Sequence, residues 1–190
     1  LQGLKMRIPG LGGEVMAQLG VNVQVLPGGE VYLALDRGAI DAAEWTGPYD
    51  DEKLGFARAA NFYYYPGWWE PGPTLNALVN QQAWNKLPNE YKAIFKTACY
   101  EANLTMLSKY DTRNGTALKR LIKQGTKLIP YENEILEAAY EASFQLYNDI
   151  SNQNKEFRIF FEQWQIFKNE ITMWNSINEY SFSKFNLEKI

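Results

Sequence analysis

The sequence predicts an α/β fold with a mainly parallel sheet followed by long helices, and three observations support this fold class. Short apolar segments alternate with short helical patterns over the first eighty residues, as expected when helices cover a parallel sheet. The turn sequence Gly-Gly-Glu-Val occurs twice, at 12–15 and 28–31, each time after a predicted strand. From Pro88 onward, apolar residues recur with helical spacing, so the second half is expected to be helical.

Glycine and proline separate the strands and helices predicted in the first eighty residues. Pro9-Gly10 and Pro66-Gly67 close two of the strands. Gly20 and Gly38 follow two of the helices, at the position after a helix end where glycine is favoured. The predicted strands cover 5–8, 22–26, 39–45, 62–65 and 74–79, and the predicted helices cover 12–19, 27–36 and 49–60.

Amphipathic helices are predicted for the second half of the chain. One begins at Pro88, which suits the first position of a helix, and runs to Gly125 with a weak point expected at Asn114-Gly115. Its apolar stripe includes Cys99, which is therefore predicted to be an inert core residue. After an extended segment at 127–130, helix resumes near Glu134, with a break expected at 151–154. The stripe of the first helix consists of Tyr91, Ile94, Phe95, Ala98, Cys99 and Ala102. A later helix carries an aromatic face that consists of Phe157, Phe160, Phe161, Trp164, Phe167, Ile171 and Trp174.

The composition excludes several classes of function. Lys and Arg number 19 against 22 Asp and Glu, and this net charge of −3 disfavours nucleic-acid binding. The sequence contains no histidine and a single cysteine, so it offers no His-based catalysis, no intramolecular disulfide and no zinc site built from several cysteines. Any metal is therefore expected to be a hard ion on oxygen ligands: sodium, calcium or magnesium.

Two candidate binding groups lie at the ends of predicted strands, where α/β proteins bind ligands. The guanidinium of Arg7 can hold a carboxylate through two parallel hydrogen bonds. Glu44, beside Trp45 and a Gly-Pro turn, can ligate a cation or a polar ligand. Each residue also has an ordinary structural alternative. Arg7 can be an edge-strand side chain that faces water, and Glu44 can be a carboxylate that caps a turn.

The segment 63–73 interleaves aromatic residues with prolines and glycines around a single charge, Glu70. The adjacent Trp68 and Trp69 cannot both face one core, so one is expected at a pocket or an interface; the alternative is a rigid connection between packed layers. The glycine-rich turn at 9–13 lacks the ending of a phosphate-binding loop, and no nucleophile–base pair stands out. These patterns favour a binding protein over an enzyme.

Taken jointly, the motifs resemble the extracytoplasmic solute-binding proteins of TRAP transporters. The resemblance rests on KMRIPG at 5–10, LPGGE at 26–30 and GAIDAAEWTGP at 38–48. YYYPGWWEPGPT at 63–74 is similar to the branch that binds α-keto acids and related small carboxylates. Residues 79–88 resemble the family's return into its long helix.

The resemblance implies the second lobe of a two-lobed periplasmic binding protein, with the N-terminal lobe missing from this sequence. Residues 1–80 are expected to form most of this α/β lobe. Residues 81–190 are expected to form the hinge-spanning helix and the helices that pack on the missing lobe. The implied function is periplasmic capture of a small α-keto or hydroxy acid and its delivery to a membrane TRAP permease, without catalysis. This branch includes dimers that exchange a C-terminal helix, so we also expect a homodimer.

The resemblance also assigns roles to individual residues. Arg7 is expected to pair with the ligand carboxylate, and Trp45 and Trp69 to contact the ligand. A sodium or calcium ion is expected to bridge ligand and protein through the Glu44 and Glu70 carboxylates and the Trp45 carbonyl. A further Gln ligand would come from the missing lobe, and Trp69 departs from the side chain expected in close relatives. Two alternatives stay open: an α/β enzyme acting on small carboxylic acids with Glu44 as base, and a fragment that does not bind ligand alone.

Overall fold

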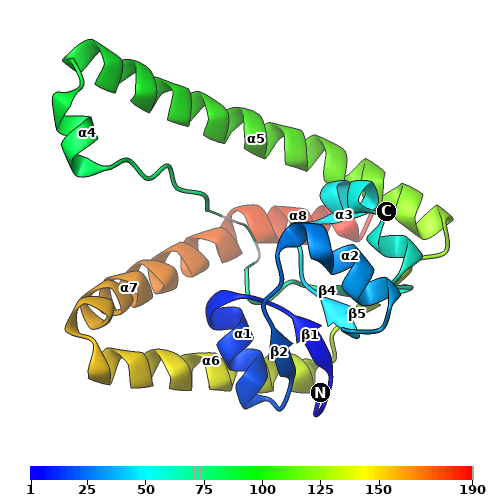
Figure 1. The fold of residues 1–190 in the computed structure, drawn as a ribbon. Helices are drawn as coiled ribbons and strands as arrows, with labels where there is room; N and C mark the ends of the chain where they lie inside the picture. Colours follow the sequence, from blue (N-terminus) through cyan, green and yellow to red (C-terminus); the bar gives the residue numbers. More distant parts are fainter. Residues whose placement is uncertain (71, 73, 190) are drawn as a thin grey trace. The chain divides into compact units, whose positions relative to one another are not determined.

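The structure is a computed structural model that describes residues 1–70, 72 and 74–189 (Figure 1). It divides into two compact units, Leu1–Ala139 and Tyr140–Ile190. The first unit contains both sheets, and the second contains only helices in its described part. The division between residues 80 and 81 expected from the sequence stays a prediction.

A three-stranded parallel sheet organises the start of the first unit. Its strands are β1 (Lys5–Arg7), β2 (Asn22–Gln24) and β3 (Ala42–Ala43), in the order β2-β1-β3. The helices α1 (Gly10–Gln18) and α2 (Gly28–Asp36) connect them in turn, because parallel neighbours require crossover connections. The parallel α/β arrangement predicted from the sequence is confirmed (Figure 1).

A second sheet pairs two segments that lie far apart in the sequence. β4 (Phe62–Tyr65) runs parallel to β5 (Lys127–Pro130), with Tyr63 opposite Leu128. Both strands fall within ranges that the sequence predicts to be extended. The pairing itself was not predicted, since parallel strands share no local turn signal.

The connection between β3 and β4 differs from the single helix predicted for 49–60. Helix α3 (Pro48–Leu54) ends at Gly55, and the 3-10 helix η1 (Phe56–Arg58) follows it. The φ angle of Gly55 is 75°, a left-handed conformation that favours glycine and ends an α-helix. The expectation of one helix is therefore wrong.

Two strand predictions also need correction. The third strand covers only β3 instead of 39–45, because the amides of Ala39 and Ile40 both donate to the Ala34 carbonyl near the end of α2. Residues 74–79 form no strand, since no described segment pairs with them.

Two clusters of buried apolar side chains stabilise this unit. The first contains residues of β1 and α1 and the segments that follow them, and the second joins α2 to η1. The members are Met6, Ile8, Met16 and Val21 in the first and Val31, Leu35, Ile40 and Phe56 in the second. Each such aliphatic side chain contributes about 1.5–3 kcal/mol when fully buried.

The longest helix exposes the apolar stripe that the sequence places in the core. α4 (Gln81–Lys86) leads into α5 (Asn89–Lys123), which continues without a break through Asn114-Gly115. Every residue of the stripe at 91–102 is exposed, and the expectation that Cys99 is a core residue is wrong. The Trp84 ring of α4 lies 5.7 Å from that of Phe95 but leaves the face exposed, and burial within α5 is confined to Ala117 and Leu121.

The second unit is built from helices rich in aromatic residues. α6 (Asn133–Gln153) begins in the first unit; α7 (Lys155–Ile177) and α8 (Glu179–Leu187) follow it. Between α6 and α7, the Asn154 side chain accepts a hydrogen bond from the Phe157 amide at 3.0 Å, an N-cap that accounts for the predicted break. Of the predicted aromatic face, Phe161 is buried, whereas most other members stay exposed. None of the described helices combines the length and the apolar character needed to cross a membrane.

Candidate functional site

Every site residue that the sequence predicts lies around one small pocket in the first unit. The pocket has a volume of about 180 Å³ and lies beside the ends of β1 and β3. Its lining consists of Arg7, Glu44, Trp45, Thr46, Trp69 and Glu70. The roles of these residues in binding stay predictions, but the structure brings the residues together.

Arg7 is the last residue of β1 and is buried, with 9% of its surface exposed. Its Nη1 donates to the Glu44 backbone carbonyl at 3.0 Å and forms an ion pair with the Glu44 carboxylate. Its Nε donates to the Leu26 carbonyl at 3.4 Å, and the guanidinium lies 4.9 Å from the centre of the Trp45 ring. The water-facing alternative for Arg7 is therefore wrong.

The second terminal nitrogen of Arg7 makes no hydrogen bond to any described residue. Because the rest of the guanidinium is held by β2, β3 and their following loops, this nitrogen is fixed beside the pocket. It can donate to an anionic ligand without the side chain having to reorganise.

Glu44 follows β3 directly and is a half-buried carboxylate in a site of mixed charge. Burial raises its pKa, the nearby Arg7 charge lowers it, and the negative charge of Glu70 raises it again. A cation between Glu44 and Glu70 would relieve this repulsion. Among the described residues the Glu44 carboxylate pairs with Arg7 and accepts from no backbone amide, so it does not cap the turn that follows β3.

Glu70 reaches the pocket by a route that the sequence does not predict. Glu44 follows β3 and Glu70 follows β4 along the chain, but these two strands belong to different sheets. Instead, a turn after β4 brings Trp69 and Glu70 back, with the Glu70 amide donating to the Gly67 carbonyl at 3.3 Å. Trp69 is held between Trp68 and Tyr131, whose ring centres lie 5.3 and 6.3 Å from its own.

Close packing on α1 also fixes the position of Trp69. A Cβ added to Gly12 would lie 3.1 Å from the Trp69 Cβ, so the glycine lets the indole approach the helix. Trp68 and Trp69 both pack against the apolar cluster around Met6 and Ile8. Trp69 also lines the pocket, so the prediction that one of the two tryptophans lies at a pocket is confirmed, whereas the expectation that both cannot face one core is wrong.

The donor atoms of the pocket fit a hard cation. Two carboxylates line it, together with Trp45 and Thr46, whereas no His or Cys does. Among the described residues, no group of three His, Cys, Asp or Glu side chains could hold a metal. An ion here would therefore need oxygen ligands from outside this segment, such as those of a bound carboxylate.

Thr46 lines the pocket, although the sequence predicts no role in binding for it. Its hydroxyl donates to Asp50 Oδ2 at 2.9 Å and so joins the pocket to the start of α3. The Thr-Gly-Pro sequence after Trp45 marked this turn, but nothing local to the sequence indicated that Thr46 faces the pocket.

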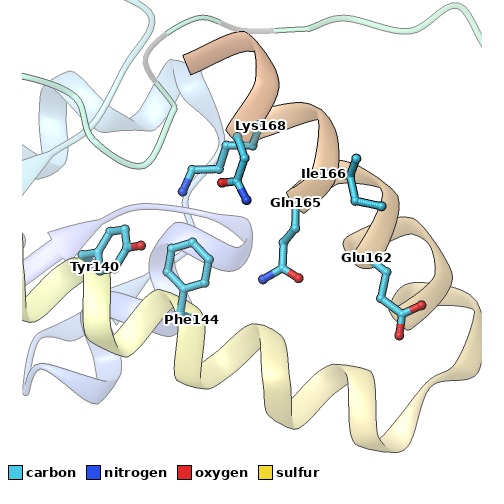
Figure 2. A pocket seen from close by; sticks show the side chains of 7 residues that line it. Tyr140, Phe144, Glu162, Gln165, Ile166 and Lys168 are labelled. Carbon is cyan, nitrogen blue, oxygen red and sulfur yellow. The ribbon is translucent and has the colours of Figure 1, made fainter. Parts of the chain in front are cut away.

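A second, larger hollow lies in the second unit, between α6 and α7, and has a volume of about 600 Å³ (Figure 2). It is lined by Tyr140, Phe144, Glu162, Gln165, Ile166, Lys168 and Asn169. The Lys168 ammonium lies 5.5 Å from the Tyr140 ring centre and 4.8 Å from that of Phe144. The positive charge of Lys168 therefore lies over two of the aromatic rings that line the hollow.

Comparison with protein families places residues 1–154 within the model for bacterial extracellular solute-binding proteins, family 7. The sequence is 64% identical, over 97% of its length, to a monocarboxylate 2-oxoacid-binding periplasmic protein of Nostoc sp.. The matched region covers 51% of that relative, so the chain spans about half of its length.

Solved structures of TRAP solute-binding proteins share the fold. One is a protein from Bordetella bronchiseptica, a dimer with calcium and picolinate in one active site. It is 43% identical to this chain with a TM-score of 0.96, and the match covers 100% of this chain and 56% of the Bordetella chain. One from Colwellia psychrerythraea with calcium and pyruvate has 34% identity and a TM-score of 0.92, covering 96% and 56% of the two chains. One from Pseudoalteromonas atlantica with sodium and pyruvate has 33% identity and a TM-score of 0.91, covering 97% and 56%.

Proposed function

Because the chain belongs to family 7 of the bacterial extracellular solute-binding proteins, we propose that it forms the second lobe of a periplasmic protein that captures a small 2-oxo acid for a TRAP permease. The observation that carries this proposal is the free nitrogen of a buried Arg7 beside the Glu44 and Glu70 carboxylates. An anion and a cation can bind side by side in such a site.

The chemistry of a 2-oxo acid suits this arrangement. Its carboxylate can accept from Arg7, while a carboxylate oxygen and the keto oxygen can both ligate a sodium or calcium ion. Glu44, Glu70 and the Trp45 carbonyl would hold that ion on the protein side. Because Arg7 is buried, its attraction to a carboxylate is stronger than it would be in water. The named relatives with calcium or sodium and pyruvate support the same ligand class.

The role we propose is capture without chemical conversion. Glu44 is engaged by Arg7 and so is a poor general base, and the relatives are named as solute-binding proteins. Incubation of the full-length protein with pyruvate, followed by NMR of the mixture, should return pyruvate unchanged. Time-dependent loss of pyruvate would instead favour the α/β enzyme with Glu44 as base.

Calorimetry on the full-length protein tests the ion-assisted site. Pyruvate should bind in calcium or sodium buffer and bind at least tenfold more weakly after chelation and exchange into a large organic cation. Glu70→Gln should lose most of the ion dependence while keeping the parent melting temperature. Glu14→Gln, at an exposed position on α1, is the matched control. A pyruvate affinity that changes neither on removal of the ion nor in Glu70→Gln would refute the cation site.

A homodimer is part of the proposal, and the Bordetella relative is described as a dimer. Many large apolar side chains of α7 and α8 are exposed, including Phe160, Phe167, Trp174, Phe182 and Phe185. Exposed apolar surface of this extent is typical of an interaction site. We propose that these helices contribute to the dimer interface.

A further inference from the structure

The loop that leaves the pocket is fastened to the long helix α5 through one carboxylate oxygen. Thr46, which lines the pocket, donates to Asp50 Oδ2 at 2.9 Å. The Tyr110 hydroxyl of α5 donates to the same oxygen at 2.5 Å. The hydrogen bond to Asp50 raises the pKa of Tyr110 to about 12, so the hydroxyl keeps its proton and remains a donor at neutral pH. A chain of two hydrogen bonds therefore runs from α5 to a pocket residue.

Asn114 provides a second link one helical turn further along α5. Its Oδ1 accepts from the Tyr49 amide at 3.1 Å, and so satisfies an amide at the start of α3 that the N-cap residue Gly47 cannot satisfy. The same oxygen lies 3.5 Å from where a Cβ on Gly47 would be, and the φ angle of Gly47 is 143°. The loop thus approaches α5 closely at Gly47.

Other contacts between α3 and α5 do not reach the pocket. Arg120 donates to both carboxylate oxygens of Glu52 at 2.6 Å, near the far end of α3. This ion pair is largely exposed and fastens the two helices without touching the loop 44–47. Arg120 and Glu52 therefore hold α3 in place, whereas Tyr110 and Asn114 contact the loop and the start of α3.

We propose that Tyr110 and Asn114 are positioning residues of the ligand site, which fix the loop after Trp45 and so orient the Trp45 carbonyl toward the bound ion. The inference deepens the proposed function and rests on it. Thr46 directly follows Trp45, so a shift of Thr46 rotates the peptide group that carries this carbonyl. Occupancy of the pocket and the position of α5 are thereby linked through Asp50.

Terbium provides a direct readout, since it occupies calcium sites and its luminescence is sensitised by nearby tryptophan. Trp45 and Trp69 line the pocket, so the full-length protein with pyruvate should give sensitised emission. The emission lifetime reports how many water molecules complete the ion's coordination. In Tyr110→Phe, loss of one hydrogen bond should weaken terbium binding about two- to tenfold and shorten the lifetime. Asn114→Ala should act in the same direction.

Three comparison variants separate positioning from stability. Tyr32→Phe removes a hydroxyl that has no hydrogen bond to the described residues and should leave binding and lifetime unchanged. Arg120→Gln breaks the exposed ion pair between α3 and α5. It should lower the melting temperature without shortening the terbium emission lifetime. Thr46→Val should weaken binding by itself, and adding Tyr110→Phe to it should have little further effect because both act on Asp50 Oδ2.

The outcomes distinguish this inference from the function on which it rests. Parent protein that binds neither terbium nor pyruvate would refute the proposed function and this inference with it. Parent protein that binds both, with an unchanged lifetime and affinity in Tyr110→Phe and Asn114→Ala, would refute the positioning role alone. Equal shortening of the lifetime in Arg120→Gln would also overturn it, because general loosening of α3 would then explain the effect.

Discussion

Arg7 shows how a single residue can be both structural and functional. Its guanidinium is buried, and such a charge is costly unless it is paired and hydrogen-bonded. Glu44 and two backbone carbonyls satisfy three of its hydrogen-bonding positions and leave one nitrogen beside the pocket. The arrangement therefore presents a preoriented donor to a ligand.

Replacing Arg7 with lysine tests this donor. In the full-length protein, Arg7→Lys should weaken pyruvate binding by about 1–3 kcal/mol, because a rigid fork with several donors becomes a single flexible ammonium. Titration calorimetry of parent and variant measures the difference. Arg37→Lys, at an exposed position after α2, is the matched control and should bind like the parent. Equal affinities for Arg7→Lys and parent would remove Arg7 from the ligand site.

Asp51 is a second buried charge near the site, and its environment disfavours ionisation. Only 6% of its surface is exposed, and burial raises its pKa to about 6 from an ordinary value of 3.8. Tyr63 of β4 donates to Oδ2, which opposes the shift, while the charges of Asp50 and Glu44 add to it. Oδ1 has no hydrogen-bond partner among the described residues.

The raised pKa makes the stability contribution of Asp51 depend on pH. Between pH 4 and 6 the Asp51 carboxyl loses its proton in the unfolded chain but keeps it in the folded chain. The free energy of unfolding therefore falls as pH rises through this range. Through this carboxyl alone, the folded protein above pH 6 is less stable by about 3 kcal/mol than it is below pH 4. Asp51→Asn should therefore gain in melting temperature relative to the parent as pH rises from 4 to 7. Scanning calorimetry across this range measures the gain. The free-energy cost of burying an unpaired amide does not change with pH. A difference in melting temperature between the variant and the parent that stays constant with pH would therefore contradict the raised pKa of Asp51.

Among the secondary-structure elements, α2 combines helix formation with support of the pocket. A Cβ on Gly28, at the start of this helix, would lie 2.5 Å from Cη2 of the Trp45 ring. That distance is too short, so any side chain here must displace the indole or the helix. The adjacent Gly29 has no heavy atom within 4 Å of its Cβ position.

These adjacent glycines provide a matched pair of variants. Gly28→Ala should displace Trp45, lower the stability by about 1–3 kcal/mol and weaken pyruvate binding. Gly29→Ala should leave binding unchanged and stabilise the helix by about 0.4–1 kcal/mol through the unfolded state. Urea denaturation and calorimetry on the full-length protein measure both effects. Similar behaviour of the two variants would show that the Trp45 contact has no energetic role.

At the scale of the whole molecule, the apolar surface exceeds what the described residues cover. In the first unit the early part of α5 exposes Tyr91, Ile94, Tyr100, Leu104 and Leu107. In the second unit most of the large exposed apolar residues lie on α7 and α8. The chain spans about half the length of the relatives it matches, and exposed apolar surface of this extent is typical of an interaction site.

Deletion of residues 155–190, which removes α7 and α8, tests the proposed dimer. The full-length protein should scatter light as a dimer, and the truncated form should scatter as a monomer, because the exposed aromatic face is lost. Phe160→Lys, at a position that is 78% exposed, is a milder variant that should also shift the equilibrium toward monomer. A parent that stays monomeric at high concentration would contradict the proposal.

The sequence by itself determined the fold class, most of the element order and five of the six pocket residues. Alternating apolar segments and glycine or proline turns are local signals, and they were enough to predict β1, β2 and β4 and the helices α1 and α2. The resemblance of the motifs then identified Arg7, Glu44, Trp45, Trp69 and Glu70, all of which line one pocket.

Only the tertiary structure decided how these residues meet and what surrounds them. The pairing of β4 with β5, the return of Glu70 from a different sheet and the contacts of α5 with the loop after Trp45 all join segments distant in sequence. The exposure of Cys99 likewise depends on what packs against α5. Local periodicity specifies which face of a helix is apolar, but it carries no information about the partner that covers it. For that physical reason the elements could be predicted and their partners could not.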